Sequence, residues 1–280
     1  MPKQLFVTKA DGSKELFDPE KVRRTASNAG ADDELAERVA AEVAKRAYDG
    51  IPTRKILEIA LKLLDRLEPH VAARYDLKGA IMRLGPAGFI FEKLLAEMLG
   101  TWGWKTKVHS MLMGKCVAHE VDVVAEKGAE RGMIEAKYHN QPGIFTGVKD
   151  ALYVVARFED LVAARTKECF FTQPWLATNT KFSADVIQYA DCRGLRLLGW
   201  KYPAKENIRF MLESKGMYPV TVMRTLESSA LQKLAEADLM FCSDLLGPVK
   251  ELYRKTGISE NRLRQLQQLA KDICEPRARG

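Results

Sequence analysis

A glycine- and proline-rich break, Leu84-Gly85-Pro86-Ala87-Gly88, divides this chain into two parts of different character. Glycine and proline together end a helix and reset the direction of the chain. Before the break, apolar residues recur mostly at helical spacing, whereas after it several short apolar segments alternate as strands do. Because 280 residues correspond to about two ordinary domains, a single small module is excluded, and we expect a multidomain α+β protein.

The composition is that of a globular protein with a nearly even spread of charge. Hydrophobic residues make up 46% of the chain and charged residues 29%, which is enough apolar material for each domain to bury a core. The net charge of +7 is not concentrated in a basic tail. This charge is compatible with a nucleic-acid partner but does not require one.

The cysteines and the N-terminus predict a cytoplasmic protein. The five cysteines are widely spaced and form no CxxC pair, so we expect free thiols rather than a zinc site. The N-terminus lacks the apolar core of a signal peptide. No stretch approaches the ~18 apolar residues of a membrane span, and we expect no membrane association.

The segment before the break, 1–85, predicts a hairpin followed by a small helical bundle. The turn Ala10-Asp11-Gly12-Ser13 joins two short strands. Asp18-Pro19 predicts a helix start, and Thr53 is expected to cap a later helix. The expected helices cover about 19–29, 33–48, 53–67 and 69–83.

The central segment, 86–205, predicts a mixed sheet with helices, in the order αβββαβαβ. Ser183 is expected to open one of these helices. The expected elements are a helix at 89–100, strands at 105–112, 119–125 and 132–138, a helix at 147–166, a strand at 168–172, a helix at 183–192 and a strand at 195–200.

The remaining segment, 206–280, predicts helices at about 226–240, 245–256 and 259–274, with Gly257 ending one helix and Ser259 capping the next. The turn between the last two is similar to that of helix-hairpin-helix DNA-binding elements, in which backbone amides approach phosphate. A plain helical dimerisation or lid element is an equally good interpretation.

Two of the central strands carry acidic residues beside strongly apolar ones. Residues i and i+2 of a strand share a face, so Glu120 pairs with Asp122, and Glu135 with Lys137. If these faces coincide, carboxylates crowd together, which raises their pKa values unless a cation neutralises them. Mg²⁺ prefers such oxygen ligands and activates water for attack on a phosphoryl group. The alternative interpretation is a solvated strand face.

The central segment contains five short motifs that together mark a known family: Phe91-Glu92-Lys93-Leu94-Leu95-Ala96, Glu120-Val121-Asp122, Glu135-Ala136-Lys137, Phe182-Ser183-Ala184-Asp185-Val186 and Leu195-Arg196-Leu197-Leu198-Gly199-Trp200. With these motifs the segment resembles the Mrr-type branch of the PD-(D/E)xK restriction-endonuclease superfamily over about 87–202. The resemblance implies that Asp122 and Glu135 are metal ligands, that Lys137 is the catalytic lysine, and that Glu92 is a possible third acid. Glu120 has no secure counterpart, and Val121 stands where that family usually has proline.

The first segment contains three motifs of a known domain: Val7-Thr8-Lys9-Ala10-Asp11-Gly12-Ser13-Lys14-Glu15, Phe17-Asp18-Pro19-Glu20-Lys21-Val22 and Asp49-Gly50-Ile51-Pro52-Thr53. With these motifs the segment resembles the ATP-cone, the nucleotide-binding regulatory domain of ribonucleotide reductases, from about residue 3 to 84. The resemblance implies nucleotide contacts from Val7, Lys9, Glu15, Lys21, Val22 and Thr53. A degenerate cone that serves only as a docking domain is the alternative.

Taken together, these patterns predict a Mg²⁺- or Mn²⁺-dependent endonuclease that hydrolyses DNA phosphodiester bonds. ATP or dATP on the cone is expected to act as a regulatory ligand, and the absence of a Walker A motif argues against its hydrolysis. We expect a homo-oligomer. The alternative is a catalytically inactive, nucleotide-responsive DNA-binding or regulatory protein.

Overall fold

The computed structural model describes residues 4–85 and 88–275 and divides by its internal contacts into two units. Unit 1 comprises Met1–Ile81 together with Gly216–Gly280, and unit 2 comprises Met82–Lys215. The C-terminal residues therefore pack with the N-terminal ones, and 206–215 belong with the central part. Within the described residues, no helix is both long and apolar enough to cross a bilayer. Pro86 and Ala87 of the predicted break lie outside the described residues.

Unit 1 begins with a three-stranded sheet in the order β2-β1-β3, where β1 pairs antiparallel with β2 and parallel with β3. The strands are β1 (Phe6–Thr8), β2 (Lys14–Leu16) and β3 (Ile51–Pro52). The helices that follow are α1 (Pro19–Ala29), α2 (Asp33–Arg46), α3 (Thr53–Leu67), α4 (Pro69–Tyr75) and α5 (Leu77–Met82).

The hairpin and helix starts of unit 1 follow the sequence closely, with three differences. Asp18 caps α1 by accepting from the N–H of Glu20 at 3.0 Å, as predicted. Thr53 does not cap α3, because the helix already begins at that residue and makes no side-chain cap bond there. The predicted helix at 69–83 is two helices that meet at Asp76, and the short strand β3 was not predicted.

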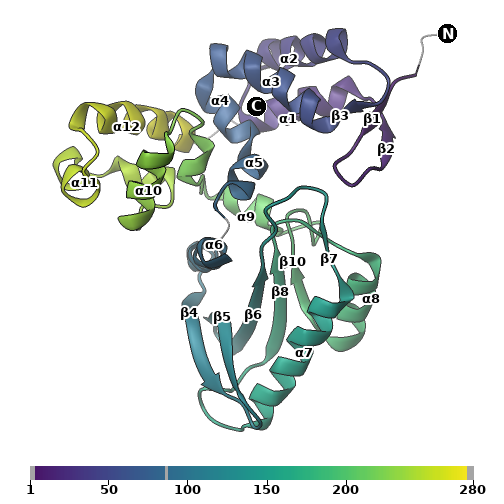
Figure 1. Ribbon diagram of the computed structural model, residues 1–280, viewed down its shortest axis with the longest axis vertical. Coiled ribbons are helices and arrows are strands. Elements are labelled where there is room, and N and C mark those ends of the chain that lie inside the picture. Colours follow the sequence, from purple (N-terminus) through teal and green to yellow (C-terminus); the bar gives the residue numbers. More distant parts are fainter. Residues whose placement is uncertain (1–3, 86–87, 276–280) are drawn as a thin grey trace. The chain divides into compact units, whose positions relative to one another are not determined.

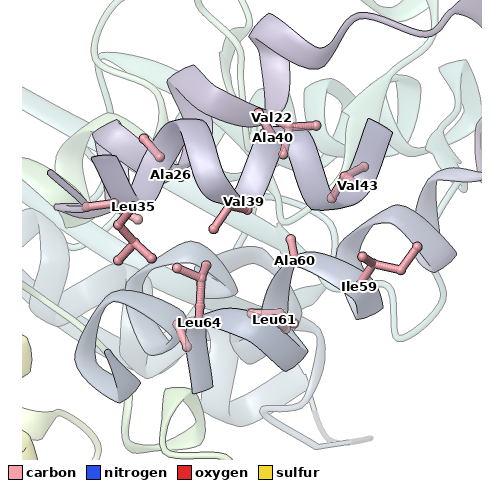
Figure 2. Close-up of a cluster of buried hydrophobic side chains, with 14 of the residues drawn as sticks. Val22, Ala26, Leu35, Val39, Ala40, Val43, Ile59, Ala60, Leu61 and Leu64 are labelled. Atoms are coloured by element: carbon pink, nitrogen blue, oxygen red, sulfur yellow. The ribbon is translucent and has the colours of Figure 1, made fainter. Parts of the chain in front are cut away.

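The core of unit 1 lies between α1, α2 and α3, whose apolar side chains point toward one another (Figure 2). Val39, Val43 and Leu64 have no exposed surface. Burying such side chains is the main favourable contribution to folding. The helices therefore depend on one another for stability.

The C-terminal helices of unit 1 dock onto α4 through a buried arginine. Arg74 donates to the carbonyls of Asp272, Ile273 and Glu275 at 2.6, 2.9 and 3.0 Å. These carbonyls end α12 and lack helical partners, so a cation there satisfies them and complements the helix dipole. The elements of this region are η1 (Val220–Val222), α10 (Ser228–Glu236), η2 (Cys242–Leu246), α11 (Val249–Thr256) and α12 (Glu260–Cys274).

The turn before α12 has the predicted chemistry. Gly257 ends α11 with a φ of 63° and Ser259 caps α12 by accepting from Arg262. The predicted helix at 245–256 is wrong at its start, because a short 3₁₀ turn precedes Pro248 and α11 begins only after that proline.

Unit 2 contains a five-stranded mixed sheet in the order β10-β8-β6-β5-β4. Strands β6, β8 and β10 run parallel, and β5 and β4 are antiparallel to their neighbours. The helices are α6 (Gly88–Thr101), α7 (Val148–Ala163), α8 (Ala184–Arg193) and α9 (Ile208–Ser214). The main strands are β4 (Lys105–Met113), β5 (Ala118–Lys127), β6 (Glu130–Lys137), β8 (Gln173–Thr178) and β10 (Arg196–Leu198), and β7 (Phe145–Thr146) and β9 (Lys181–Phe182) form a separate pair.

The observed order of the main elements matches the predicted αβββαβαβ, and Ser183 caps α8 as expected. The predicted strand at 168–172 is wrong: those residues precede β8, which begins at Gln173 and contains Pro174. Proline lacks the N–H that a ladder needs and is therefore atypical of central strands. That is why this segment was not recognised as the strand.

Helices α7 and α8 lie together on one side of this sheet (Figure 1). Met133, Leu176 and Leu197 pack with Val154 of α7 and Val186 of α8 in one core. Side chains alternate along a strand, so their neighbours point to the opposite face. Helix α6 packs against β4, β5 and β6 on that opposite face.

Leu64→Ala should destabilise unit 1 by about 2 to 5 kcal/mol, because a fully buried leucine leaves a cavity when it is truncated. Urea unfolding followed by far-UV circular dichroism measures this change. Leu67→Ala on the same helix is the control, since Leu67 is 37% exposed and should lose under about 1 kcal/mol. Equal losses from the two variants would contradict the proposed core.

Candidate functional site

A pocket of about 210 Å³ opens in unit 1 between the hairpin and the starts of α1 and α3. All of the residues predicted to contact a nucleotide line it: Val7, Lys9, Glu15, Lys21, Val22 and Thr53. The sequence did not single out Tyr75 of α4, which also lines the pocket and whose pKa is raised to about 12 by burial. The pocket is smaller than the ~300 to 1,000 Å³ typical of small-molecule sites, so it suits part of a nucleotide with the remainder outside.

Glu15 bridges the two lysines of the pocket. Its carboxylate forms ion pairs with Lys9 and with Lys21, both across very short contacts. All three side chains remain partly exposed, between 32% and 50%, so water screens these pairs and each contributes little stability. The lysines are therefore held near each other and can exchange the carboxylate for phosphate oxygens.

In unit 2 the predicted acidic residues come from three elements and lie close together. Asp122 of β5 accepts from the backbone N–H of Ala136 in β6 at 2.7 Å, which fixes it beside Glu135. Glu92 of α6 is linked to these carboxylates electrostatically, since the charges of Asp122 and Glu135 both raise its pKa. The crowding predicted from the strand periodicity is therefore present.

Burial, together with repulsion between neighbouring carboxylates, raises the pKa values of these groups. Burial first, and then the charges of Asp122, Glu120 and Glu135, raise the pKa of Glu92 to about 7. Burial likewise raises the pKa values of Asp122 and Glu135, and Arg157 partly offsets both increases. A carboxyl group with a pKa near 7 can hold or release a proton at neutral pH.

Arg157 of α7 is the main cation of this cluster. It is 7% exposed, forms a close ion pair with Glu135 and stacks on Tyr153 with 5.1 Å from Cζ to the ring centroid. Its spacing along α7 gives no sign of burial, because only the fold brings that helix beneath Glu135.

His109 of β4 is a second residue that the sequence did not reveal. Its Nδ1 lies 3.1 Å from Glu92 Oε2 and 3.6 Å from Glu120 Oε1, so it joins the two acids. Its φ of 49° is in the left-handed region, which is strained for a residue with a β-carbon and concentrates at functional positions. Glu120 remains exposed at the edge of the cluster.

Lys137 lies at the end of β6, with its Nζ 3.1 Å from Asp150 Oδ1 and its side chain 44% exposed. It is thus close enough to lower the pKa of Glu135 and accessible to a ligand. A lysine so placed can exchange Asp150 for an anionic oxygen.

The carboxylate oxygens of this cluster are suitable ligands for a hard divalent cation, but they are not arranged to coordinate one. Carboxylate oxygens are the ligands that Mg²⁺ and Mn²⁺ prefer. In the described part of the chain, however, no three His, Cys, Asp or Glu side chains are grouped so that they could hold a metal ion. Glu135 is engaged by Arg157 and Asp122 by a backbone N–H, and either must be released first.

Comparison with known proteins identifies two regions of the chain. Residues 5–77 match the ATP cone domain, and residues 218–274 match the family described as AF1548-like, C-terminal. An uncharacterized protein from Archaeoglobus fulgidus is 44% identical over 179 residues, which cover 64% of this chain and 99% of that protein. The crystal structure of a protein of unknown function, AF1548, aligns with a TM-score of 0.58 and 41% identity over 67% of this chain and 98% of that one.

These comparisons define a protein that joins an ATP-cone at its N-terminus to an AF1548-like C-terminal region. The chain belongs to the AF1548-like family. Since 179 matched residues exceed the length of unit 1, the relationship includes part of unit 2. Neither relative has an assigned activity, so the Mrr-type resemblance stays a prediction.

Replacing Lys9 or Lys21 by alanine should weaken ATP binding by roughly tenfold, because each change removes a charge-assisted contact to phosphate. Isothermal titration calorimetry measures the affinity directly. Lys14→Ala, an exposed lysine of β2 that is not part of the pocket lining, should bind ATP like the wild type. The same affinity in all the variants would contradict this assignment.

Glu92→Gln should make the protein more stable at pH 8 and change little near pH 4.5. The folded state raises the pKa of Glu92 from 4.5 to about 7, so the wild type loses stability as the pH rises through this range. The gain at pH 8 should be roughly 1 to 2 kcal/mol, below the full conversion of the shift because solvent screens the partly exposed group. Urea unfolding at both pH values measures it.

Glu159→Gln, which alters an exposed glutamate of α7, is the control and should follow the wild-type pH dependence. The account fails if Glu92→Gln loses as much stability as the wild type between pH 4.5 and pH 8.

Proposed function

We propose that the protein is a metal-dependent deoxyribonuclease whose activity responds to ATP or dATP bound at the cone. The observation that supports the nuclease is the convergence of Glu92, Asp122 and Glu135 from three elements into one partly buried cluster. Burial raises the pKa values of all three, and the charge of Asp122 raises those of Glu92 and Glu135 further. Such like charges are costly in a folded protein and are usually retained at functional sites.

Each residue of the cluster has a distinct role in this proposal. Asp122 and Glu135 would hold Mg²⁺ or Mn²⁺, and such a cation, when bound, would supply an activated water and neutralise charge on the phosphoryl group. Lys137 exchanges Asp150 for a phosphate oxygen and orients the scissile group. Glu92, with a pKa of about 7, holds or releases a proton near the reacting atoms.

Arg157 limits when this arrangement can form. While it pairs with Glu135, that carboxylate lacks a free oxygen on the side of the guanidinium. Release of Arg157 from Glu135 leaves a cation next to the site, where it can bind a phosphate oxygen. Ligand binding and the release of this pair are therefore coupled.

Nucleotide binding at the cone supplies the regulation. The ATP-cone match supports a nucleotide ligand, and the lysine pair of the pocket provides positive charge for its phosphates. We propose that ATP or dATP changes assembly into a homo-oligomer or access of DNA to the acidic cluster, without being hydrolysed.

Asp122→Ala and Lys137→Ala should each reduce cleavage of plasmid DNA by at least about a hundredfold, since each removes a charge that acts on the reacting phosphate. The assay uses Mg²⁺ or Mn²⁺ with and without ATP. Lys149→Ala, an exposed lysine of α7, should cleave as the wild type does. Activity that survives both substitutions would reject the proposed site.

A second candidate is a catalytically inactive, nucleotide-responsive DNA-binding or regulatory protein. It is favoured by the engagement of Glu135 and Asp122 with partners of the chain itself. A wild type that cleaves no DNA with any metal or nucleotide, yet binds DNA, would support it. Competition between DNA and RNA substrates separates a third possibility, an RNA-directed nuclease.

A further inference from the structure

A second pocket in unit 2, of about 430 Å³, lies on the sheet face opposite α7 and α8. Its apolar wall is formed by Leu99, Trp102, Trp104, Trp175, Leu198 and Met211. Its volume is within the ~300 to 1,000 Å³ range of small-ligand sites. None of its lining residues belongs to the acidic cluster.

Tryptophan dominates this pocket. It contains three of the four tryptophans of the chain, and Trp104 and Trp175 pack edge to face with 5.1 Å between ring centroids. Gly132 makes room for them, since a β-carbon there would lie 2.9 Å from the indole nitrogen of Trp175. Trp102 and Trp104 stay partly exposed, and aromatic surface left open in a hollow is typical of a binding site.

Cations of the chain already lie over these indoles. Arg196 is stacked on Trp175 with 4.0 Å from Cζ to the ring centroid, and Lys127 lies 5.7 Å from the centroid of Trp104. A cationic ligand would therefore meet positive charge at the ring faces that would attract it. A flat aromatic ligand that carries negative charge avoids this conflict, because it can stack on indole and pair its charge with Arg196 and Lys127.

A nucleobase with its phosphate has this combination of properties. Bases of any sequence stack on tryptophan, and arginine and lysine pair with phosphate oxygens. Glu130 lies 3.8 Å from Arg196, so its exposed carboxylate is the partner that a phosphate would replace.

We propose that this tryptophan pocket binds an unpaired nucleobase together with its phosphate. The ligand is either a free mononucleotide or one unit of a single strand. The site goes beyond the proposed nuclease cluster, because none of its lining residues belongs to that cluster. It remains if that cluster proves inactive.

The test uses the full-length protein in a chelator, so that binding is measured without cleavage. One probe is a fluorescein-labelled oligothymidylate of about twelve nucleotides, followed by fluorescence anisotropy. The other is thymidine monophosphate, followed by quenching of tryptophan fluorescence. Binding of the monophosphate alone identifies a mononucleotide site, and binding of only the oligonucleotide identifies a strand site. Either result supports the pocket.

Trp104→Leu should weaken binding by about tenfold, because it removes a stacking surface, whereas Trp104→Phe keeps an aromatic face and should stay within about threefold of the wild type. Arg196→Gln should weaken binding by roughly fivefold. Its control is Arg193→Gln, because the two arginine side chains are 41% and 44% exposed and only Arg196 lines the pocket.

Thermal unfolding of each variant shows whether it is folded, and Trp104→Phe and Arg196→Gln test the site even if Trp104→Leu is unstable. The proposal is overturned if Arg196→Gln and Arg193→Gln bind alike, or if the oligonucleotide gives no anisotropy change and the monophosphate no quenching of tryptophan fluorescence. Failure of plasmid cleavage, by contrast, bears only on the acidic cluster.

Discussion

The burial of Glu92, Asp122 and Glu135 close to one another is the constraint on which the interpretation of unit 2 depends. Carboxylates that are buried together oppose ionisation, and a fold that keeps them needs compensating groups. Here Arg157 pairs with Glu135, the N–H of Ala136 binds Asp122, and His109 contacts Glu92 in a strained conformation. Each partner comes from a different place in the sequence, so the cluster exists only because the sheet and its helices bring them together. Hydrophobic residues would fill this space at lower electrostatic cost, which is why we interpret the acids as functional.

Both candidate sites are neutralised by the chain itself. In the cone, Glu15 bridges the lysines that would contact phosphate, and in unit 2 Arg157 occupies the carboxylate that would hold a cation. Ligand binding at either site must exchange one ion pair for another. The net free energy of binding is therefore smaller than the attraction between the ligand and its site. Small differences between ligands then decide which of them binds. Such an arrangement suits a protein that binds nucleotide reversibly and responds to its concentration.

Local sequence chemistry predicted the elements well where one residue type determines the geometry. Asp18 and Ser183 cap their helices, Gly257 ends α11, and the order of strands and helices in unit 2 follows from periodicity. The sequence-based prediction was wrong where pairing with a distant strand overrides the local preference of the residues. This is the case at Pro174 inside β8 and in the two-residue strand β3. Strand alternation and known motifs singled out the acids and lysines that lie together in the cone pocket and in the acidic cluster. Arg157 and His109 were missed because their roles arise from contacts between elements distant in sequence, and so was the packing of the C-terminal helices on α4 through Arg74.

The most direct test of the crowded-carboxylate account is the titration of Glu92 itself. Carbon-13 NMR of protein labelled at the glutamate side-chain carboxyl follows each group as the pH changes, and Glu92→Gln assigns the signal. The account predicts a midpoint of about 7 for Glu92 in metal-free protein. A midpoint near the ordinary value of 4.5 would contradict it, because the three carboxylates would then not be crowded in solution.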